Sequence, residues 1–370
     1  MSYLFRNNLN EYEKHISRNL EFLVDFVRKK IGNQVETIFL SGSLSKGQGS
    51  GYLNKNKKLI LVGDYDIICV TKLGKPFFWA PSMPHMADYK FLHGNAPVTV
   101  NLIPKRKLKN IRPTIEYWDW VNSRQVLFGN PQVFDQITFR RSRNHLSHVI
   151  SIIFNRFVYL VREVGDLKNM DNQIEFSHWL AKAIIGIADA RLVMAESYVS
   201  RFQDKLKKLL ELGVDEGFIQ NFKRALRIIK YPEKVSDLDL LFDAVKRELR
   251  NMLYLINSDN PKNDLDLILP KLNRIRASKN LSSRLRRLKW IGRPDLEAIS
   301  YYAYVYLLFS IKLKDNKMEV DNINLLDKAV ALISNSYRDN KLLLQLNQCT
   351  PIEKWKKSRE LLREMDALDF

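Results

Sequence analysis

Cysteine is scarce in this 370-residue chain, which contains only Cys69 and Cys349. Two cysteines cannot build a disulfide framework, so we expect the protein to work in a reducing cytoplasm. They also leave the six histidines without the cysteine partners that a zinc site needs. Long apolar runs are missing too, because none approaches the roughly 18 residues of a membrane span, and the polar N-terminus lacks a signal-peptide pattern. The sequence therefore predicts a cytoplasmic protein that does not enter a membrane.

Acidic residues are in short supply relative to basic ones. The chain has 41 Asp and Glu against 60 Lys and Arg, which gives a formal net charge of +19. A field this positive favours polyanions, and nucleic acid is the commonest large one. The alternative is a set of solvated basic faces that bind nothing in particular. We expect nucleic acid or another polyphosphate as a ligand.

The first 140 residues show the pattern of an α+β fold. Up to Ile31, apolar side chains recur at three- and four-residue spacing, which predicts a helix. Residues rich in β-formers predict strands over 35–40, 59–71 and 98–103, with a polar loop over 41–58. At this length the chain is expected to hold two domains.

The rest of the chain is expected to be almost entirely helical, with no repeating period of a solenoid. The domain boundary is expected between Pro131 and Asn144, giving domains of residues 1–140 and 141–370. Helices are predicted over residues 144–163, 175–198, 201–212, 216–229, 237–257, 266–276, 294–313, 324–336 and 352–366.

Two short motifs in the N-terminal part indicate chemistry. Gly42 and Ser43 directly follow the first predicted strand, and a Gly-Ser turn in this place can bring backbone N–H groups against a phosphate. Asp64 and Asp66 stand two residues apart on the next predicted strand, so their side chains share one face. Two carboxylates beside a phosphate-sized turn are what a Mg²⁺-nucleotide site requires.

This order of elements resembles the nucleotidyltransferase superfamily typified by DNA polymerase β. Members carry a hydrophobic residue before Gly-Ser, and then Asp-x-Asp among hydrophobic residues. Gly42 and Ser43 match the first element, and Asp64 and Asp66, followed by residues 67–70, match the second. The spacing between the elements exceeds the family's usual one by about ten residues, which an Asn- and Lys-rich insertion explains, because loops tolerate insertions. The helical half is similar to that of kanamycin-type nucleotidyltransferases.

The resemblance implies an α+β N-terminal domain with a mixed sheet and helices, followed by a large all-α domain. Asp64 and Asp66 would be catalytic and would hold Mg²⁺, or alternatively Mn²⁺. The Gly42 and Ser43 backbone and the Ser43 hydroxyl would hold the β- and γ-phosphates, and Lys46 could add a point charge. The implied reaction transfers a nucleoside monophosphate from an NTP, with ATP expected, to nucleic acid rather than to a small molecule.

The third predicted strand departs from the family pattern. Members usually carry a third carboxylate there, whereas this chain has Thr99 and Asn101, and neither can act as a general base at neutral pH. Glu116, Glu163 or Glu175 could supply the base from elsewhere. Alternatively, two aspartates and one metal could suffice for an acidic acceptor, or the site could be degraded and only bind nucleotide or nucleic acid.

Basic residues cluster in three places. The stretch from Lys271 to Arg293 alternates cations with apolar residues and contains no acid, which indicates a basic amphipathic segment with a possible polyanion groove. Others follow the third strand, where they could guide an acceptor toward the two aspartates, or lie at the domain junction. The candidate nucleic-acid contacts are Lys105, Arg106, Lys107, Arg140, Arg141, Arg274, Arg276, Arg284, Arg286, Arg287 and Lys289.

Three hypotheses remain open. The leading one is an active metal-dependent nucleotidyltransferase, and the second is a non-catalytic member of the same fold that binds nucleic acid. The third is an antitoxin or assembly subunit whose helices bind a partner or form an oligomer. The aromatic run of Tyr117, Trp118 and Trp120 could stack on a base, although such clusters more often belong to a core.

Overall fold

A computed structural model describes most of the chain. The described residues are 3–4, 10–53, 59–72, 98–109, 111, 114–138, 145–164, 167, 169–233, 235–257, 265, 269, 296–337 and 340–368. The chain forms two compact units. The first comprises Met1–Arg143, Tyr198–Lys208 and Leu226–Glu233, and the second comprises Asn144–Ser197, Leu209–Ala225 and Lys234–Phe370. Beyond residue 143 the chain therefore returns to the first unit twice, which a single boundary in sequence does not describe.

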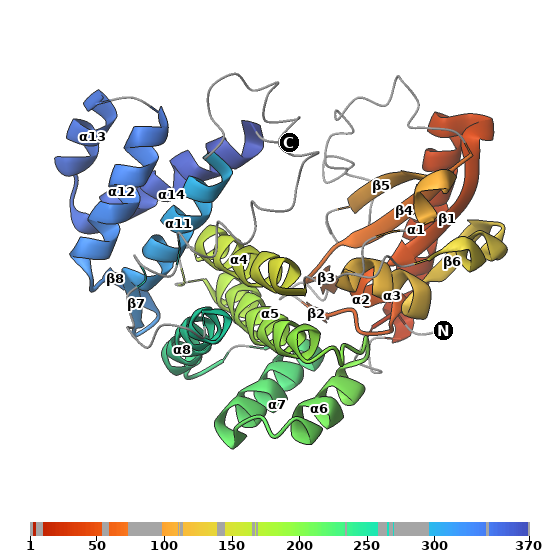
Figure 1. Ribbon diagram of the computed structural model, residues 1–370, viewed down its shortest axis with the longest axis horizontal. Helices are drawn as coiled ribbons and strands as arrows, with labels where there is room; N and C mark the ends of the chain where they lie inside the picture. Colours follow the sequence, from red (N-terminus) through yellow and green to blue (C-terminus); the bar gives the residue numbers. More distant parts are fainter. Residues whose placement is uncertain are drawn as a thin grey trace. The chain divides into compact units, whose positions relative to one another are not determined.

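The first unit is built on a four-stranded mixed sheet of order β5-β4-β1-β6 (Figure 1). Strand β1 pairs antiparallel with β4 and β6, whereas β4 and β5 run parallel. The starts of β4 and β5 therefore lie beside the end of β1, and the ends of β4 and β5 lie beside its start. The strands are β1 (Val35–Ser41), β4 (Tyr65–Thr71), β5 (Val98–Pro104) and β6 (Gln125–Gly129).

The two faces of this sheet pack against different elements. Alternate residues of β1 and β4, such as Ile38 and Ile67, lie in one apolar cluster with the inner side of α1 (Asn10–Ile31). The intervening residues, such as Phe39 and Ile68, lie in a second cluster with Leu108, Trp120, Val133 and Phe134. Those four residues belong to η4 (Lys105–Leu108), α3 (Ile115–Ser123) and η5 (Pro131–Gln136). The alternation follows from the pleat of a strand.

The segment between β1 and β4 has more structure than a loop. It contains the one-turn helix α2 (Gly42–Ser45) and the ribbon β2 (Gly51–Leu53) with β3 (Leu59–Leu61). The single strand expected over 59–71 is wrong in this detail, because the chain leaves β3 at Val62 and enters β4 only at Tyr65. Gly63, with φ of 150°, makes this break possible at little steric cost.

The second unit is a helical assembly centred on α5 (Met170–Met194). Helix α5 is buried on nearly all sides and packs against α4 (His145–Glu163) and α8 (Leu238–Ile256). A helix that is apolar all round belongs in the core of an assembly. Among the described residues, the unit also contains α11 (Leu296–Phe309), α12 (Ile323–Tyr337), α13 (Asn340–Asn347) and α14 (Pro351–Leu368). Helices α6 (Phe202–Glu211) and α7 (Glu216–Lys230) have residues in both units.

The expected class, an α+β part followed by a helical part, is confirmed. The helix predicted over 294–313 ends at Phe309, and the chain continues into a hairpin of β7 (Ile311–Lys314) and β8 (Lys317–Val320). Asp315 and Asn316 form its two-residue turn with positive φ of 50° and 58°, values that Asp and Asn tolerate and that hairpin turns require. The helix expected over 266–276 lies outside the described residues, apart from Leu269. Within the described ranges, no helix combines the length and apolarity needed to cross a membrane.

Candidate functional site

Asp66 lies near the start of β4 between two flanking strands. Its direct neighbours are Ser41 on β1 and Thr99 on β5. Directly paired residues project from the same face of a sheet, and Phe39 and Ile68 on that face belong to the cluster that contains Trp120 of α3. The Asp66 carboxylate therefore projects from the α3 side of the sheet, at the end where β1 finishes.

Gly42 lies against the Asp66 carboxylate. The backbone at Gly42 has a φ of +71°, which glycine adopts without strain. A Cβ built on this residue would overlap Asp66 Oδ2 and lie 3.1 Å from Cγ. Only glycine therefore permits both the turn and the close approach of the carboxylate. The chain continues from Gly42 into α2, where the Ser45 hydroxyl donates to the Gly42 carbonyl at 3.0 Å.

Asp64 precedes β4 and lies next to the same turn. It lines a small pocket together with Ser43, and both side chains are half-buried. The rest of the lining consists of Leu44, Gly49, Ser50, Leu61, Val62 and Gly63. The structure thus brings Gly42 to Asp66 and Ser43 to Asp64 within one unit. The roles assigned to these residues stay predictions.

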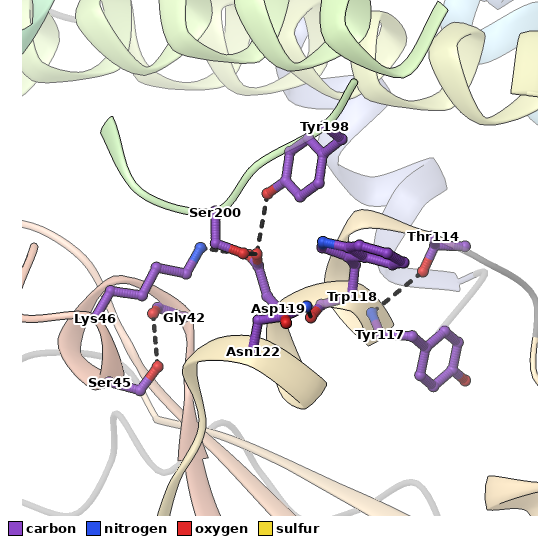
Figure 2. A network of polar contacts seen from close by, with 10 residues as sticks. All are labelled: Gly42, Ser45, Lys46, Thr114, Tyr117, Trp118, Asp119, Asn122, Tyr198 and Ser200. Atoms are coloured by element: carbon purple, nitrogen blue, oxygen red, sulfur yellow. Dashed lines mark hydrogen bonds and ion pairs between the residues drawn. The ribbon is translucent and has the colours of Figure 1, made fainter. Parts of the chain in front are cut away.

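Lys46 points to a carboxylate that sequence reasoning did not select. Its ammonium forms an ion pair with Asp119 of α3, and the two side chains are only 9% and 14% exposed. The other Asp119 oxygen, Oδ1, accepts from the Tyr198 hydroxyl at 3.0 Å and from the Ser200 hydroxyl at 2.5 Å (Figure 2). A phosphate contact of Lys46 stays a prediction, and any such contact would compete with this ion pair.

The Asp119 network connects parts of the first unit that are far apart in sequence. Lys46 follows the Gly-Ser turn, whereas Tyr198 and Ser200 belong to a segment that returns to this unit after α5. The second segment that returns to this unit, Leu226–Glu233, is attached to the region after the Gly-Ser turn, because the Ser50 hydroxyl donates to the Ile229 carbonyl at 2.8 Å. One signal in the sequence could have indicated Asp119, namely a single acid enclosed by Trp118 and Trp120 in an aromatic run.

The position beside Asp66 that would suit a third carboxylate holds Thr99. Thr99 is half-buried, and Asn101 is exposed opposite Ile68. Within the residues that the structure describes, no group of three or more His, Cys, Asp or Glu side chains could hold a metal ion. A metal at this site would therefore take two carboxylates from the described chain and its other ligands from substrate and water, which is common for Mg²⁺.

The three glutamates considered as alternative bases lie in different places. Glu116 stands in the first turn of α3, one turn from Asp119. Glu163 and Glu175 belong to the second unit, on α4 and α5. Burial raises the pKa of Glu163 and of Glu175, and the neighbouring Glu163 charge further raises the pKa of Glu175. A raised pKa suits a general base, but their participation in the site stays a prediction.

The aromatic run divides between core and surface. Trp120 is buried and meets Phe39 edge-on with ring centroids 5.6 Å apart, so it is a core residue. The Tyr117 ring packs edge-on against Trp120, with ring centroids 4.6 Å apart. Trp118 is 40% exposed, which leaves part of its ring accessible.

The basic residues after β5 lie at the far end of the sheet from the two aspartates. Lys105, Arg106 and Lys107 form η4 directly after Pro104, which pairs with Thr71, whereas Asp66 pairs with Thr99 near the start of β5. Lys105, Arg106 and Lys107 therefore do not lie beside the aspartates. Strands β4 and β5 are parallel, Asp64 and Asp66 lie at the start of β4, and the three cations follow the end of β5. The candidates Arg140, Arg141, Arg274, Arg276, Arg284, Arg286, Arg287 and Lys289 lie outside the described residues.

His178 on α5 gives the second unit a testable pH dependence. It is 1% exposed, and neither ring nitrogen has a hydrogen-bond partner in the described structure. Burial, and to a lesser extent the Lys182 charge, lowers the pKa of the imidazole well below its ordinary value of 6.5. The folded protein keeps the ring neutral while the unfolded chain protonates near pH 6.5. We therefore expect the free energy of unfolding to fall below that pH, by up to about 1.4 kcal/mol per pH unit from this residue.

Urea unfolding at pH 7.5, 6.5 and 5.5 tests this expectation on the wild type and on His178→Leu. The leucine variant should lose this part of the pH dependence, whatever its own stability at pH 7.5. An unchanged slope between pH 6.5 and 5.5 in the variant would show that the imidazole does not stay neutral in the fold.

Comparison with known proteins adds no family to this description, because no protein-family model matches the chain and no curated protein matches it.

Proposed function

We propose that this protein is a Mg²⁺-dependent nucleotidyltransferase that moves a nucleoside monophosphate from an NTP, with ATP expected, to a nucleic-acid acceptor. The observation that carries the proposal is the packing of the Gly42 turn against the Asp66 carboxylate, with Asp64 and Ser43 on the adjoining pocket. A turn that offers backbone N–H groups beside two carboxylates joins the two things that a metal-bound triphosphate needs.

The residues present fit a magnesium ion, with manganese as the alternative. Asp64 and Asp66 supply hard oxygen ligands, and the missing Cβ at Gly42 leaves the carboxylate close to the turn. When bound with the triphosphate, the ion would offset the charge that develops on the departing pyrophosphate.

The chain's own residues would mainly position the reactants. The Gly42 and Ser43 backbone and the Ser43 hydroxyl would orient the β- and γ-phosphates, so that the acceptor hydroxyl lies in line with the α-phosphorus. Little covalent chemistry is asked of the protein in such a transfer, and most of the rate comes from position and electrostatics. The net charge of +19 supports a polyanionic acceptor.

The test is transfer of label from each α-labelled NTP to mixed RNA and DNA, with Mg²⁺ and with Mn²⁺. Wild type should label an acceptor, and Asp64→Asn/Asp66→Asn should lose the activity while keeping the fold. Asp204→Asn is the matched control, since Asp204 is an exposed acid in the same unit. The proposal fails if wild type labels nothing with any NTP and either metal, or if the double variant retains wild-type activity.

Thr99 favours a second candidate function, a nucleotide-binding protein of the same fold that performs no transfer. Its side chain lies beside Asp66, and a hydroxyl cannot serve as a base at neutral pH. Binding of Mg²⁺-ATP by wild type, abolished in Asp64→Asn/Asp66→Asn and accompanied by no transfer, would establish this candidate over the first.

Thr99→Asp should turn the arrangement into a three-carboxylate site. A third negative charge beside Asp66 is expected to lower thermal stability without metal and to make the melting temperature rise with Mg²⁺, because the ion relieves the repulsion. If a base is what limits the wild type, transfer should increase about tenfold or more. Thr99→Asn is the uncharged control. A melting temperature that does not respond to Mg²⁺ would contradict the placement of residue 99 beside the metal site.

A further inference from the structure

The end of the first-unit sheet that lies away from Asp66 carries an unusual density of positive charge. Val35 at the start of β1, Thr71 at the end of β4 and Pro104 at the end of β5 are neighbours in register. Three of the chain segments that reach this end bear cations. They are Arg28, Lys29 and Lys30 in the last turn of α1, Lys72 after β4, and Lys105, Arg106, Lys107 and Lys109 after β5.

Six of these cations form what we call the basic sheet end: Lys29, Lys30, Lys72, Arg106, Lys107 and Lys109. All six are exposed, and within the described part of the chain none of them forms an ion pair with an acid. The two other cations are engaged, Arg28 with Asp25 at 3.7 Å and Lys105 with Glu36 at 2.8 Å. The nearby acids therefore neutralise Arg28 and Lys105 but leave the six in excess.

The backbone that carries the basic sheet end is held by the core. Leu108 is fully buried in the apolar cluster on the α3 side of the sheet, next to Arg106 and Lys107 in sequence. The Lys72 N–H donates to the Gln34 carbonyl at 2.9 Å, which places Lys72 beside the segment that leads from α1 into β1. Cations on an anchored backbone lose less conformational freedom on binding than cations on a free loop.

We propose that the basic sheet end binds the phosphate backbone of a single-stranded nucleic acid, as a surface separate from the Asp64 and Asp66 site. The two lie at opposite ends of strands seven residues long, about 20 Å apart at 3.3 Å per residue. Charge complementarity selects a polyphosphate chain, because unpaired cations spread over three segments match repeated phosphates rather than one anion. The choice of nucleic acid rests on the proposed function, in which the surface would hold the acceptor away from the reacting end.

A charge-reversal experiment tests the surface. Binding of a fluorescein-labelled 30-nucleotide RNA is measured between 50 and 200 mM salt for wild type and for Lys72→Glu/Arg106→Glu/Lys107→Glu. The matched control is Lys314→Glu/Lys317→Glu/Lys356→Glu, which changes the net charge equally at exposed positions of the second unit. We expect the first variant to bind the RNA about tenfold or more weakly, and its slope of log affinity against log salt concentration to become shallower by about two units. The affinity of the control should change less than about threefold.

Three results would overturn the inference. They are equal weakening by both triple variants, no RNA binding by wild type, and wild-type binding to phosphatidylserine vesicles in preference to RNA. Asp64→Asn/Asp66→Asn separates this surface from the transfer site, because it should bind the RNA as wild type does even though it transfers nothing. If transfer is absent in every protein but the binding pattern holds, the proposed function fails and the surface stands.

Discussion

Gly42→Ala is expected to reduce the nucleotide transfer that we propose by about a hundredfold or more, because a displacement of a reacting group by about 1 Å has effects of this size. The new Cβ would overlap Asp66 Oδ2, so the carboxylate must leave its place or the turn must shift. The φ of +71° adds a left-handed strain of about 1–2 kcal/mol for alanine. Steady-state labelling and urea unfolding measure the two effects.

Gly32→Ala is the matched control for this prediction. Gly32 has a similar φ of +62°, but a Cβ there would meet nothing within 4 Å. It should therefore show the backbone strain alone, with activity close to that of wild type. The double variant Gly42→Ala/Asp66→Ser should regain part of the lost stability, since the overlap between the new Cβ and the residue 66 side chain is relieved. It should regain none of the activity, because the proposed metal ligand is absent. Wild-type transfer in Gly42→Ala would show that Asp66 is not held against the turn during the reaction.

Asp119→Ala is expected to destabilise the first unit by about 3–5 kcal/mol, since it takes the Asp119 carboxylate away from the buried Lys46 ammonium. Three donors converge on this carboxylate, from Lys46, Tyr198 and Ser200. Their separation in sequence means that one substitution loosens the contact between the α2 turn and the segment after α5. The measurement is the free energy of unfolding in urea.

Asp25→Ala provides the comparison for an exposed ion pair of the same unit. Asp25 and Arg28 have side chains 65% and 49% exposed, and such pairs contribute about 0–1 kcal/mol. The double variant Lys46→Met/Asp119→Leu should recover much of the stability lost in Asp119→Ala, because no charge is then left buried. Similar losses for Asp25→Ala and Asp119→Ala would mean that the Asp119 carboxylate and the Lys46 ammonium are both well hydrated in solution.

Much of the fold could be predicted from the local pattern of apolar and polar residues in the sequence. The periodicity up to Ile31 marks α1, and the β-formers around Ile38 and Val100 mark β1 and β5, because each side-chain pattern repeats with the period of its own element. Strand β6 was missed, since four of its residues are only half-buried, Gly129 is exposed, and the strand shows no clear alternation. The hairpin after α11 was missed because apolar residues continue beyond Ser310 into β7, although Asp315 and Asn316 carry a turn signal.

The sequence by itself indicated, through the order of its two motifs, that Gly42 and Ser43 would lie near Asp64 and Asp66. Only the tertiary structure decided what lies beside Thr99, which acid holds Lys46, and at which end of the sheet Lys105 to Lys107 lie. These depend on the parallel pairing of β4 with β5 and on contacts over long sequence separations, such as that between Asp119 and Ser200. Side-chain periodicity reports the face on which a residue lies but carries no information on the direction or the partner of a strand.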